Sequence, residues 1–318
     1  MCLLLGCAPR QAEGAAGVLA GSSVPNFPGL VSTGQLAEWQ RGGRVSLIDV
    51  RSDVFTYLRG HLPGAVYLST ETLRATEGGV PAQLLPAGSY RDLFSRLGLS
   101  FDQPVVIYSA GETGNIHATF LAWLLAGFGH PKVHVLDGGY FKWELEHRPV
   151  VQRYPRVGPV AFPSDPFTPE RASLEEVRRA VATQDAVLVD ARSPAQYAGE
   201  AGAQMRRGHI PGAINHYWQD DLTQVGFGHV WKSAAELRTR YAAQGITPDK
   251  NIIAYCNMAA EASHVHFTLR YLLGYPRVRI YVGSWTEWAE RVELPVEVGK
   301  GGSAAAGQRD SGTAKVSP

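Results

Sequence analysis

Short runs of apolar residues alternate along the chain with longer segments in which apolar residues recur at three- and four-residue steps. Residues 105–108 (VVIY) and 252–255 (IIAY) are typical of buried strands, whereas residues 33–40 and 173–181 have the spacing of helices. Ser173, with a glutamate three positions later, fits a capping box at the start of the second of these helices. Strands that alternate with helices favour a mainly parallel sheet with helices on both faces, so the chain is predicted to have an α/β fold.

This pattern occurs twice, in the same order, in the two halves of the chain. Residues 47–51 (LIDVR) and 60–66 (GHLPGAV) in the first half correspond to residues 188–192 (LVDAR) and 208–214 (GHIPGAI) in the second. Each half continues with a strand that ends in tyrosine, a helix, and a block of glycine and aromatic residues. A repeat whose blocks keep their order indicates two domains of the same fold.

The repeat divides the chain into five predicted segments. The two domains span residues 29–149 and 170–298, and residues 150–169 between them are rich in proline without periodicity, which predicts a linker on the surface. Residues 299–318 are small and polar without periodicity, which predicts a disordered tail. Residues 1–28 are predicted to be a tether or the remnant of a lipoprotein signal.

The first residues contain a possible site of lipid attachment. Residues 4–7 (LLGC) match the lipobox at which bacterial lipoprotein signals are cut, which would leave the lipid on Cys7. Against this, the start of the chain lacks a charged region and its apolar part is short for a signal. Two interpretations remain open: a lipid-anchored protein of the cell envelope or periplasm, and a cytoplasmic protein in which the match arises by chance.

Composition narrows the classes of function. A net charge of +1 over 318 residues gives no electrostatic footprint for nucleic acid, and no apolar run approaches the roughly 20 residues of a membrane span. Cys2, Cys7 and Cys256 are the three cysteines, and two of them lie at the very start, so a disulfide framework is not expected. His264 and His266 are two positions apart on a predicted helix and cannot bind one metal ion together. We expect neither a cofactor nor a metal.

Cys256 is the strongest candidate for chemistry. It directly follows the predicted strand at residues 252–255, and a short link leads from it into a helix. A cysteine at such a junction faces unpaired backbone N–H groups and the positive end of a helix dipole, and both favour the thiolate. The alternative is an inert, buried cysteine. Ser109 takes the same place in the first half with no base evident nearby, so the first half is predicted to have no chemistry of its own.

Together these features resemble the two-domain rhodanese family of sulfurtransferases, over about residues 33–296. An Asp-x-Arg after a strand, the GHxPGA turn, a strand ending in Tyr-Cys and the closing GSWTEW carry the resemblance, and residues 247–250 (TPDK) and 271–276 (YLLGYP) resemble the bacterial thiosulfate sulfurtransferase branch. The resemblance implies two rhodanese-like domains, of which the first is inactive. It also implies that the cysteine of the second domain takes up a sulfane sulfur as a persulfide and passes it on.

The resemblance further implies roles for individual residues. It makes Cys256 the persulfide carrier and implies a small sulfur donor and a thiol or cyanide acceptor as partners; we expect a monomer. Asp190 and His209 are expected to be structural residues near the site, and Asp190 with Arg192 would pin the strand end beside the loop. The positions implied for substrate binding are Asn257, Met258, Ala259, Ala260, Glu261 and Ala262, together with Arg192 and with Gln196, which stands where some members have an arginine.

The loop after Cys256 departs from the usual family pattern, Cys-Arg-x-Gly-x-x. Asn257 replaces the arginine, Ala259 replaces the glycine, and Glu261 brings a negative charge to the rim. A thiosulfate dianion would therefore lose charge-assisted hydrogen bonds worth roughly 1.5–3 kcal/mol each. Arg206 and Arg207 could supply positive charge from another loop or could simply lie in solvent. We expect weak activity on thiosulfate, or a less charged donor.

Two other functions compete with sulfur transfer. A cysteine phosphatase on this scaffold needs an arginine six positions after the nucleophile, where this chain has Ala262, so a phosphatase is disfavoured. A catalytically weak sulfur-relay or binding module would keep the fold while the altered loop has lost turnover. The sequence therefore predicts a sulfurtransferase that works through Cys256, with the relay or binding module as the alternative.

Overall fold

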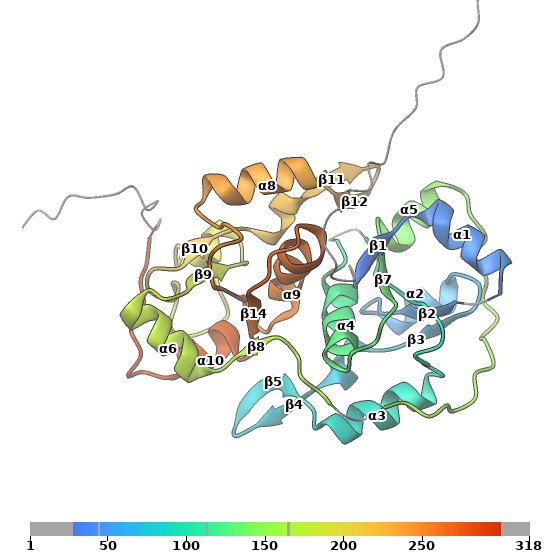
Figure 1. The fold of residues 1–318 in the computed structure, drawn as a ribbon, viewed down its shortest axis with the longest axis horizontal. Helices are drawn as coiled ribbons and strands as arrows, with labels where there is room; N and C mark the ends of the chain where they lie inside the picture. Colours follow the sequence, from blue (N-terminus) through green and yellow to red (C-terminus); the bar gives the residue numbers. More distant parts are fainter. Residues whose placement is uncertain (1–27, 44, 112–113, 164–165, 300–318) are drawn as a thin grey trace, which may run out of the picture.

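The computed structural model describes residues 28–43, 45–111, 114–163 and 166–299, which form two α/β domains (Figure 1). The first domain has five parallel strands, β1 (Gly29–Val31), β2 (Ser46–Asp49), β3 (Ala65–Tyr67), β6 (Val105–Tyr108) and β7 (Val133–Leu136), in the order β1-β7-β6-β2-β3. Its helices are α1 (Thr33–Arg41), α2 (Val54–Arg59), α3 (Ala87–Arg96), α4 (Ile116–Gly127) and α5 (Gly139–Leu145). A short 3-10 helix, η1 (Thr70–Leu73), leads into a hairpin of β4 (Arg74–Glu77) and β5 (Val80–Leu84).

The second domain repeats this arrangement. Its parallel strands are β8 (Arg171–Ala172), β9 (Val187–Asp190), β10 (Ile214–Asn215), β13 (Ile252–Tyr255) and β14 (Val278–Tyr281), in the order β10-β9-β13-β14-β8. Its helices are α6 (Leu174–Thr183), α7 (Pro194–Tyr197), α8 (Ala234–Ala243), α9 (Ala260–Phe267), which continues as a π-helical turn, η3 (Thr268–Leu272), and α10 (Ser284–Glu290). The 3-10 helix η2 (Trp218–Asp221) leads into the hairpin β11 (Leu222–Val225) and β12 (Gly228–Trp231). The predicted α/β class is confirmed.

Successive side chains of a buried strand point to opposite faces of its sheet, and helices cover both faces. In β6, Val105 and Ile107 pack in the core that includes α3 and α4, whereas Val106 and Tyr108 pack in a separate core that includes α1 and α5. The predicted capping box is also confirmed: the backbone N–H of Glu176 donates to the Ser173 hydroxyl at 3.2 Å.

One hydrophobic core runs through both domains. It joins α3 and α4 of the first domain to α8 and α9 of the second, and α4 packs directly against α9. Thr119 on α4 and Ser263 on α9, both fully buried, share a hydrogen bond of 2.9 Å across this contact. The helix that follows Cys256 is therefore supported by the first domain as well as by its own sheet.

Each domain also extends its hairpin onto the other. The β4–β5 hairpin reaches from the first domain toward α10, and the β11–β12 hairpin reaches from the second domain to α5 (Figure 1). The backbone N–H of His229 donates to the carbonyl of Gly111 at 2.9 Å, and that of Trp231 donates to Asp137 Oδ1 at 3.1 Å. The hairpins thus make a reciprocal interface around the helix pair.

The outer segments are described in part. Within residues 150–169 the described residues form no helix, and Val151 makes an isolated bridge with His61. Gly299, which the sequence assigned to the tail, donates its N–H to the carbonyl of Ala198 at 2.9 Å. The rest of that tail and residues 1–27, with the predicted lipid site at Cys7, lie outside the described residues. Among the helices that are described, none has the length and apolar character to cross a membrane.

Candidate active site

Cys256 lies directly beyond the end of β13, at the carboxyl edge of the second sheet, and its side chain is fully buried. The turn before α10 holds its backbone on both sides. The N–H of Cys256 donates to the Ser284 hydroxyl at 3.2 Å, and the N–H of Trp285 donates to the Cys256 carbonyl at 2.9 Å. The position of the sulfur is therefore fixed by two neighbouring strand ends rather than by its loop alone.

The Cys256 sulfur is surrounded by backbone donors and one carboxylate. The N–H groups of Met258 and Ala262 point at it, and the side chain of Glu261 forms a hydrogen bond with the thiol. Burial, and next the negative charge of Glu261, raise the pKa of Cys256 to about 12, although the two N–H groups act in the opposite direction. The expectation that this junction favours the thiolate is therefore wrong for the free protein, because burial of the thiol, and next the charge of the half-buried Glu261, outweigh the backbone donors.

Glu261 is the second residue of α9, is half-buried, and forms a hydrogen bond with the Cys256 thiol. Burial raises the pKa of its carboxyl group, while hydrogen bonds from the Cys256 thiol and the Asn257 N–H lower it. These contacts place the Cys256 thiol and the Glu261 carboxyl group within hydrogen-bonding reach of each other.

The loop between Cys256 and α9 has a left-handed residue where the family pattern has glycine. Ala259 has a φ of +67° and is fully buried, and the N–H of Ser263 donates to its carbonyl at 2.9 Å. A left-handed alanine costs on the order of 1 kcal/mol relative to glycine. Met258 is exposed, and the side-chain oxygen of Asn257 is buried with no hydrogen-bond partner among the described residues. Ala260 is the first residue of α9.

Asp190 and Arg192 form a buried pair next to the loop. The shortest of their contacts joins Arg192 Nη2 to Asp190 Oδ2 at 2.5 Å, and the same nitrogen donates to the Gly208 carbonyl at 2.8 Å. The guanidinium carbon lies 4.7 Å from the ring centre of Trp285. Because these contacts occupy the guanidinium group, Arg192 acts as a brace between the strand end and the turn that holds Cys256.

The other sequence-predicted residues lie on α7 and in the segment after it. Gln196, on α7, is half-buried and accepts a hydrogen bond from the Ser193 hydroxyl at 3.3 Å. His209 is buried, stacks on the Tyr197 ring with centres 3.6 Å apart, and bonds the Tyr197 carbonyl through Nδ1 at 2.8 Å. Arg206 donates to the carbonyls of Arg291 and Leu294, both at 2.6 Å, and Arg207 is exposed.

The equivalent position in the first domain carries a hydroxyl. Ser109 follows β6 directly and is buried, and its Oγ accepts a hydrogen bond from the Ala118 N–H at 3.1 Å. Its own N–H donates to the side chain of Asn115 at 3.1 Å. The backbone arrangement at this strand end thus holds a serine, whereas the matching arrangement in the second domain holds a thiol.

Sequence reasoning missed an arginine of the first domain whose charge acts on this site. Arg74 opens β4, is half-buried at the domain boundary, and has its guanidinium carbon 4.2 Å from the ring centre of Phe120 on α4. Its charge interacts with Cys256 and Glu261 in the other domain. No motif marks Arg74 in the sequence, and its effect on Cys256 arises only from the packing of the two domains.

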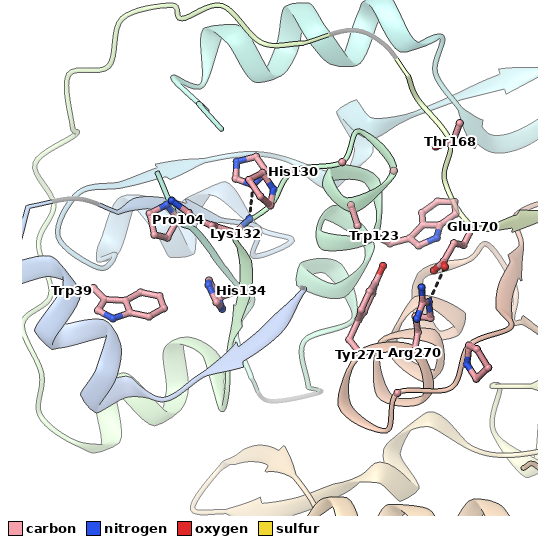
Figure 2. A pocket seen from close by; sticks show the side chains of 16 residues that line it. Trp39, Pro104, Trp123, His130, Lys132, His134, Thr168, Glu170, Arg270 and Tyr271 are labelled. Carbon is pink, nitrogen blue, oxygen red and sulfur yellow. Dashed lines mark hydrogen bonds and ion pairs between the residues drawn. The ribbon is translucent and has the colours of Figure 1, made fainter. Parts of the chain in front are cut away.

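A separate cavity of about 1010 Å³ opens between the domains near the ends of α4 and η3 (Figure 2). Figure 2 shows Trp123, Tyr271, and the ion pair of Glu170 with Arg270 on one side, and Trp39 with His134 on the other. No residue from 256 to 262 lines this cavity, so it is not the site around Cys256. The described residues contain no cluster of three or more His, Cys, Asp or Glu side chains suited to a metal ion.

Comparisons with known proteins agree with the repeat. A model of the rhodanese-like domain matches residues 32–146 and again 173–291. The chain is 36% identical over 270 residues to a "Putative thiosulfate sulfurtransferase" of Synechococcus elongatus, covering 83% of each protein. It is also 36% identical over 284 residues to the sulfur carrier protein TtuD of Thermus thermophilus, covering 85% of this chain and 97% of the relative.

Solved structures share the fold. The wild-type structure of EanB matches with a TM-score of 0.74 at 24% identity, covering 85% of this chain and 69% of EanB. An EanB variant with a cysteine persulfide and ergothioneine matches with a TM-score of 0.73 at 23% identity, covering 85% of this chain and 70% of that one. The two matched segments and the sequence identity over most of the chain lead to one assignment. The protein belongs to the rhodanese-like family and has two domains of that family in tandem.

Proposed function

We propose that this protein transfers a sulfane sulfur through a persulfide on Cys256 and that the first domain has no chemistry of its own. The observation that carries the proposal is the pair of backbone N–H groups, from Met258 and Ala262, that point at the Cys256 sulfur. Such donors stabilise negative charge on sulfur, and a persulfide is charged over more of the physiological pH range than a thiol. The first domain holds only the hydroxyl of Ser109 at the equivalent place.

The transfer has two steps, both of which balance without a further oxidant. As the Cys256 sulfur attacks the outer sulfur of the donor, its proton passes to the Glu261 carboxylate with which it is hydrogen-bonded. The sulfur–sulfur bond of the donor breaks, and the donor leaves with the bonding electron pair. An acceptor thiolate or cyanide then attacks the outer sulfur of the persulfide, and Cys256 leaves as a thiolate that regains the proton.

The electrostatics of the site favour a donor with less negative charge than thiosulfate. Glu261 lies against the reacting sulfur, and Asn257 stands where an arginine would bind a dianion. A second negative group close to the Glu261 carboxylate would be repelled in a region with little water. A small persulfide fits these conditions better, and the name of the relative TtuD, a sulfur carrier protein, accords with sulfur relay.

The second candidate is a sulfur-relay module that turns over slowly with any small molecule. The full burial of Cys256 and its raised pKa of about 12 favour this alternative, because both slow the reaction of the free thiol. The two candidates share the persulfide and differ in its rate of formation. Relay from a protein persulfide would require the loop at Met258 to admit the partner.

Intact-mass measurement after incubation with thiosulfate and with a small hydropersulfide tests the proposal. We expect the mass of one sulfur atom to be added with the hydropersulfide, less with thiosulfate, and to disappear after cyanide treatment. Cys256→Ser should abolish the adduct, whereas the double variant Cys2→Ser and Cys7→Ser should keep it. The absence of any adduct with every donor would overturn the proposal, and an adduct that persists in Cys256→Ser would assign the chemistry elsewhere.

A further inference from the structure

The two hairpins that cross the domain boundary are related, but they present different residues to the opposite domain. Arg74 is the first residue of β4, directly after η1, and Leu222 is the first residue of β11, directly after η2. Leu222 packs against Gly114, in the segment that follows Ser109, where an added Cβ would meet its methyl group at 2.8 Å. The hairpin of the second domain therefore presents an apolar side chain, Leu222, to the segment that follows Ser109.

Arg74 has the corresponding place at the start of the hairpin that extends from the first domain. Its guanidinium group stacks on Phe120, on the same helix as Thr119. The hydroxyl of Thr119 bonds Ser263, two residues beyond Glu261. Among the groups that act on the charge of Arg74, Cys256 comes first, before Glu71 and Glu261. The first domain thus supplies a positive charge that acts on Cys256 of the second.

The hydrogen-bonding capacity of Arg74 is not filled. Its Nε is buried and has no hydrogen-bond partner among the described residues. A buried donor without a partner costs free energy that an incoming acceptor can recover. An arginine that served only to join the domains would gain from an ion pair, yet none is found for Arg74 in the part of the chain that the structure describes.

We propose that Arg74 binds the anionic group of a singly charged sulfur donor, a carboxylate on a small hydropersulfide, and so makes the first domain part of the active site. This inference rests on the proposed function and specifies its donor. The carboxylate would lie against Arg74, with the outer sulfur directed at Cys256 and away from the Glu261 carboxylate. The thiol of Cys256 gives its proton to Glu261, its sulfur takes the outer sulfur of the donor, and the donor leaves as a thiolate that takes up a proton from water.

A matched pair of donors isolates the carboxylate. The hydropersulfides of mercaptopropionate and of mercaptoethanol have the same reacting sulfur and differ in one carboxylate. The measurement is the rate of persulfide formation on Cys256 against donor concentration, by quenching and intact mass. In Arg74→Met we expect the half-saturating concentration of the mercaptopropionate donor to rise about tenfold or more, since a charge-assisted contact is lost, and that of the mercaptoethanol donor to stay within about twofold.

Two controls separate binding from structure. Arg91→Met removes an exposed positive charge of the same domain, paired with Asp92, and should change neither donor. Arg74→Lys keeps the positive charge but loses the planar guanidinium group. Its half-saturating concentration for the carboxylate donor should therefore lie between those of wild type and Arg74→Met, while that for the other donor should not change.

If Arg74→Met does not fold, the wild-type protein still gives the test. Added salt should raise the half-saturating concentration of the mercaptopropionate donor and not that of the mercaptoethanol donor.

Equal changes for both donors in the Arg74 variants, no change for either, or an equal response of both to salt would overturn the role of Arg74 while leaving sulfur transfer in place. Failure of the proposed function has a different signature, because wild-type protein would then form no adduct with either donor.

Discussion

The hydroxyl of Thr119 lies 2.9 Å from the hydroxyl of Ser263, and this hydrogen bond joins the helix after the Ser109 position in one domain to the helix after Cys256 in the other. Both residues are fully buried, in a core that runs through both domains. Because α9 begins at the loop that holds the sulfur, the contact ties the active loop to the first domain.

Ser263→Ala should lower the free energy of unfolding by about 1 kcal/mol, since Thr119 keeps a second acceptor in the carbonyl of Ile116 at 3.0 Å. Chemical denaturation followed by fluorescence measures the change. Thr239→Ala is the matched control, because that hydroxyl is exposed and bonds only within its own helix; it should change the free energy by less than about 0.5 kcal/mol. Equal effects of the two variants would contradict a stabilising role for the interdomain bond.

Glu261→Gln should lower the pKa of the Cys256 thiol from about 12 by on the order of one unit, because it removes the negative charge beside the sulfur. A lower thiol pKa means more thiolate at any given pH below it, so thiolate absorbance should appear at lower pH than in wild type. The measurement is an ultraviolet titration corrected with Cys256→Ser. An unchanged or higher pKa would show that Glu261 does not act on the sulfur.

The same variant separates two roles of Glu261. If the carboxylate accepts the thiol proton during transfer, persulfide formation should slow in Glu261→Gln although the thiolate is more abundant. If the carboxylate only repels charge, persulfide formation should speed up, most of all with thiosulfate.

The sequence predicts those parts of the site that depend on neighbouring residues. The place of Cys256 follows from an apolar run that ends beside it and a helix that begins soon after, and the structure has β13 at Ile252–Tyr255 and α9 from Ala260. The family pattern has glycine at position 259, which suggests a positive φ there. Ala259 has a positive φ in the structure. Both features depend only on residues of one strand–loop–helix unit, from β13 to α9.

The parts of the site that the sequence did not predict depend on tertiary packing and on the directions of side chains. The acidity of Cys256 is governed by how deeply two domains bury it and by where the Glu261 side chain turns, and neither follows from spacing. Arg74 lies in the other domain, on a hairpin with no motif, and its charge acts on Cys256 only because this hairpin extends onto the second domain. A sequence repeat predicts that the domains are alike but not which residues each gives to the other.

Asp190→Asn and Asp49→Asn form a second matched pair, one in each domain. Arg192 pairs with Asp190 at 2.5 Å and Arg51 pairs with Asp49 at 2.6 Å, and all four side chains are buried. Each substitution leaves a buried arginine without its full partner, so each should lower the free energy of unfolding by roughly 3–5 kcal/mol. At a temperature where both variants are folded, only Asp190→Asn should slow persulfide formation. Equal slowing in both would show that the effect is one of stability alone.

Ala259→Gly should stabilise the protein, which is unusual for a glycine introduced into a buried position. The φ of +67° costs alanine on the order of 1 kcal/mol of strain in the folded protein, and glycine removes this strain. Glycine also gives the unfolded chain more conformational entropy, but the free energy of that effect is smaller than the strain removed. Ala260→Gly, one residue later, is the matched control: it lies in the first turn of α9, where glycine should cost about 0.5–1 kcal/mol. Opposite signs for the two variants in thermal and chemical unfolding are the expected result. A loss of stability in Ala259→Gly equal to that in Ala260→Gly would mean that the loop relaxes around its alanine and stores no strain.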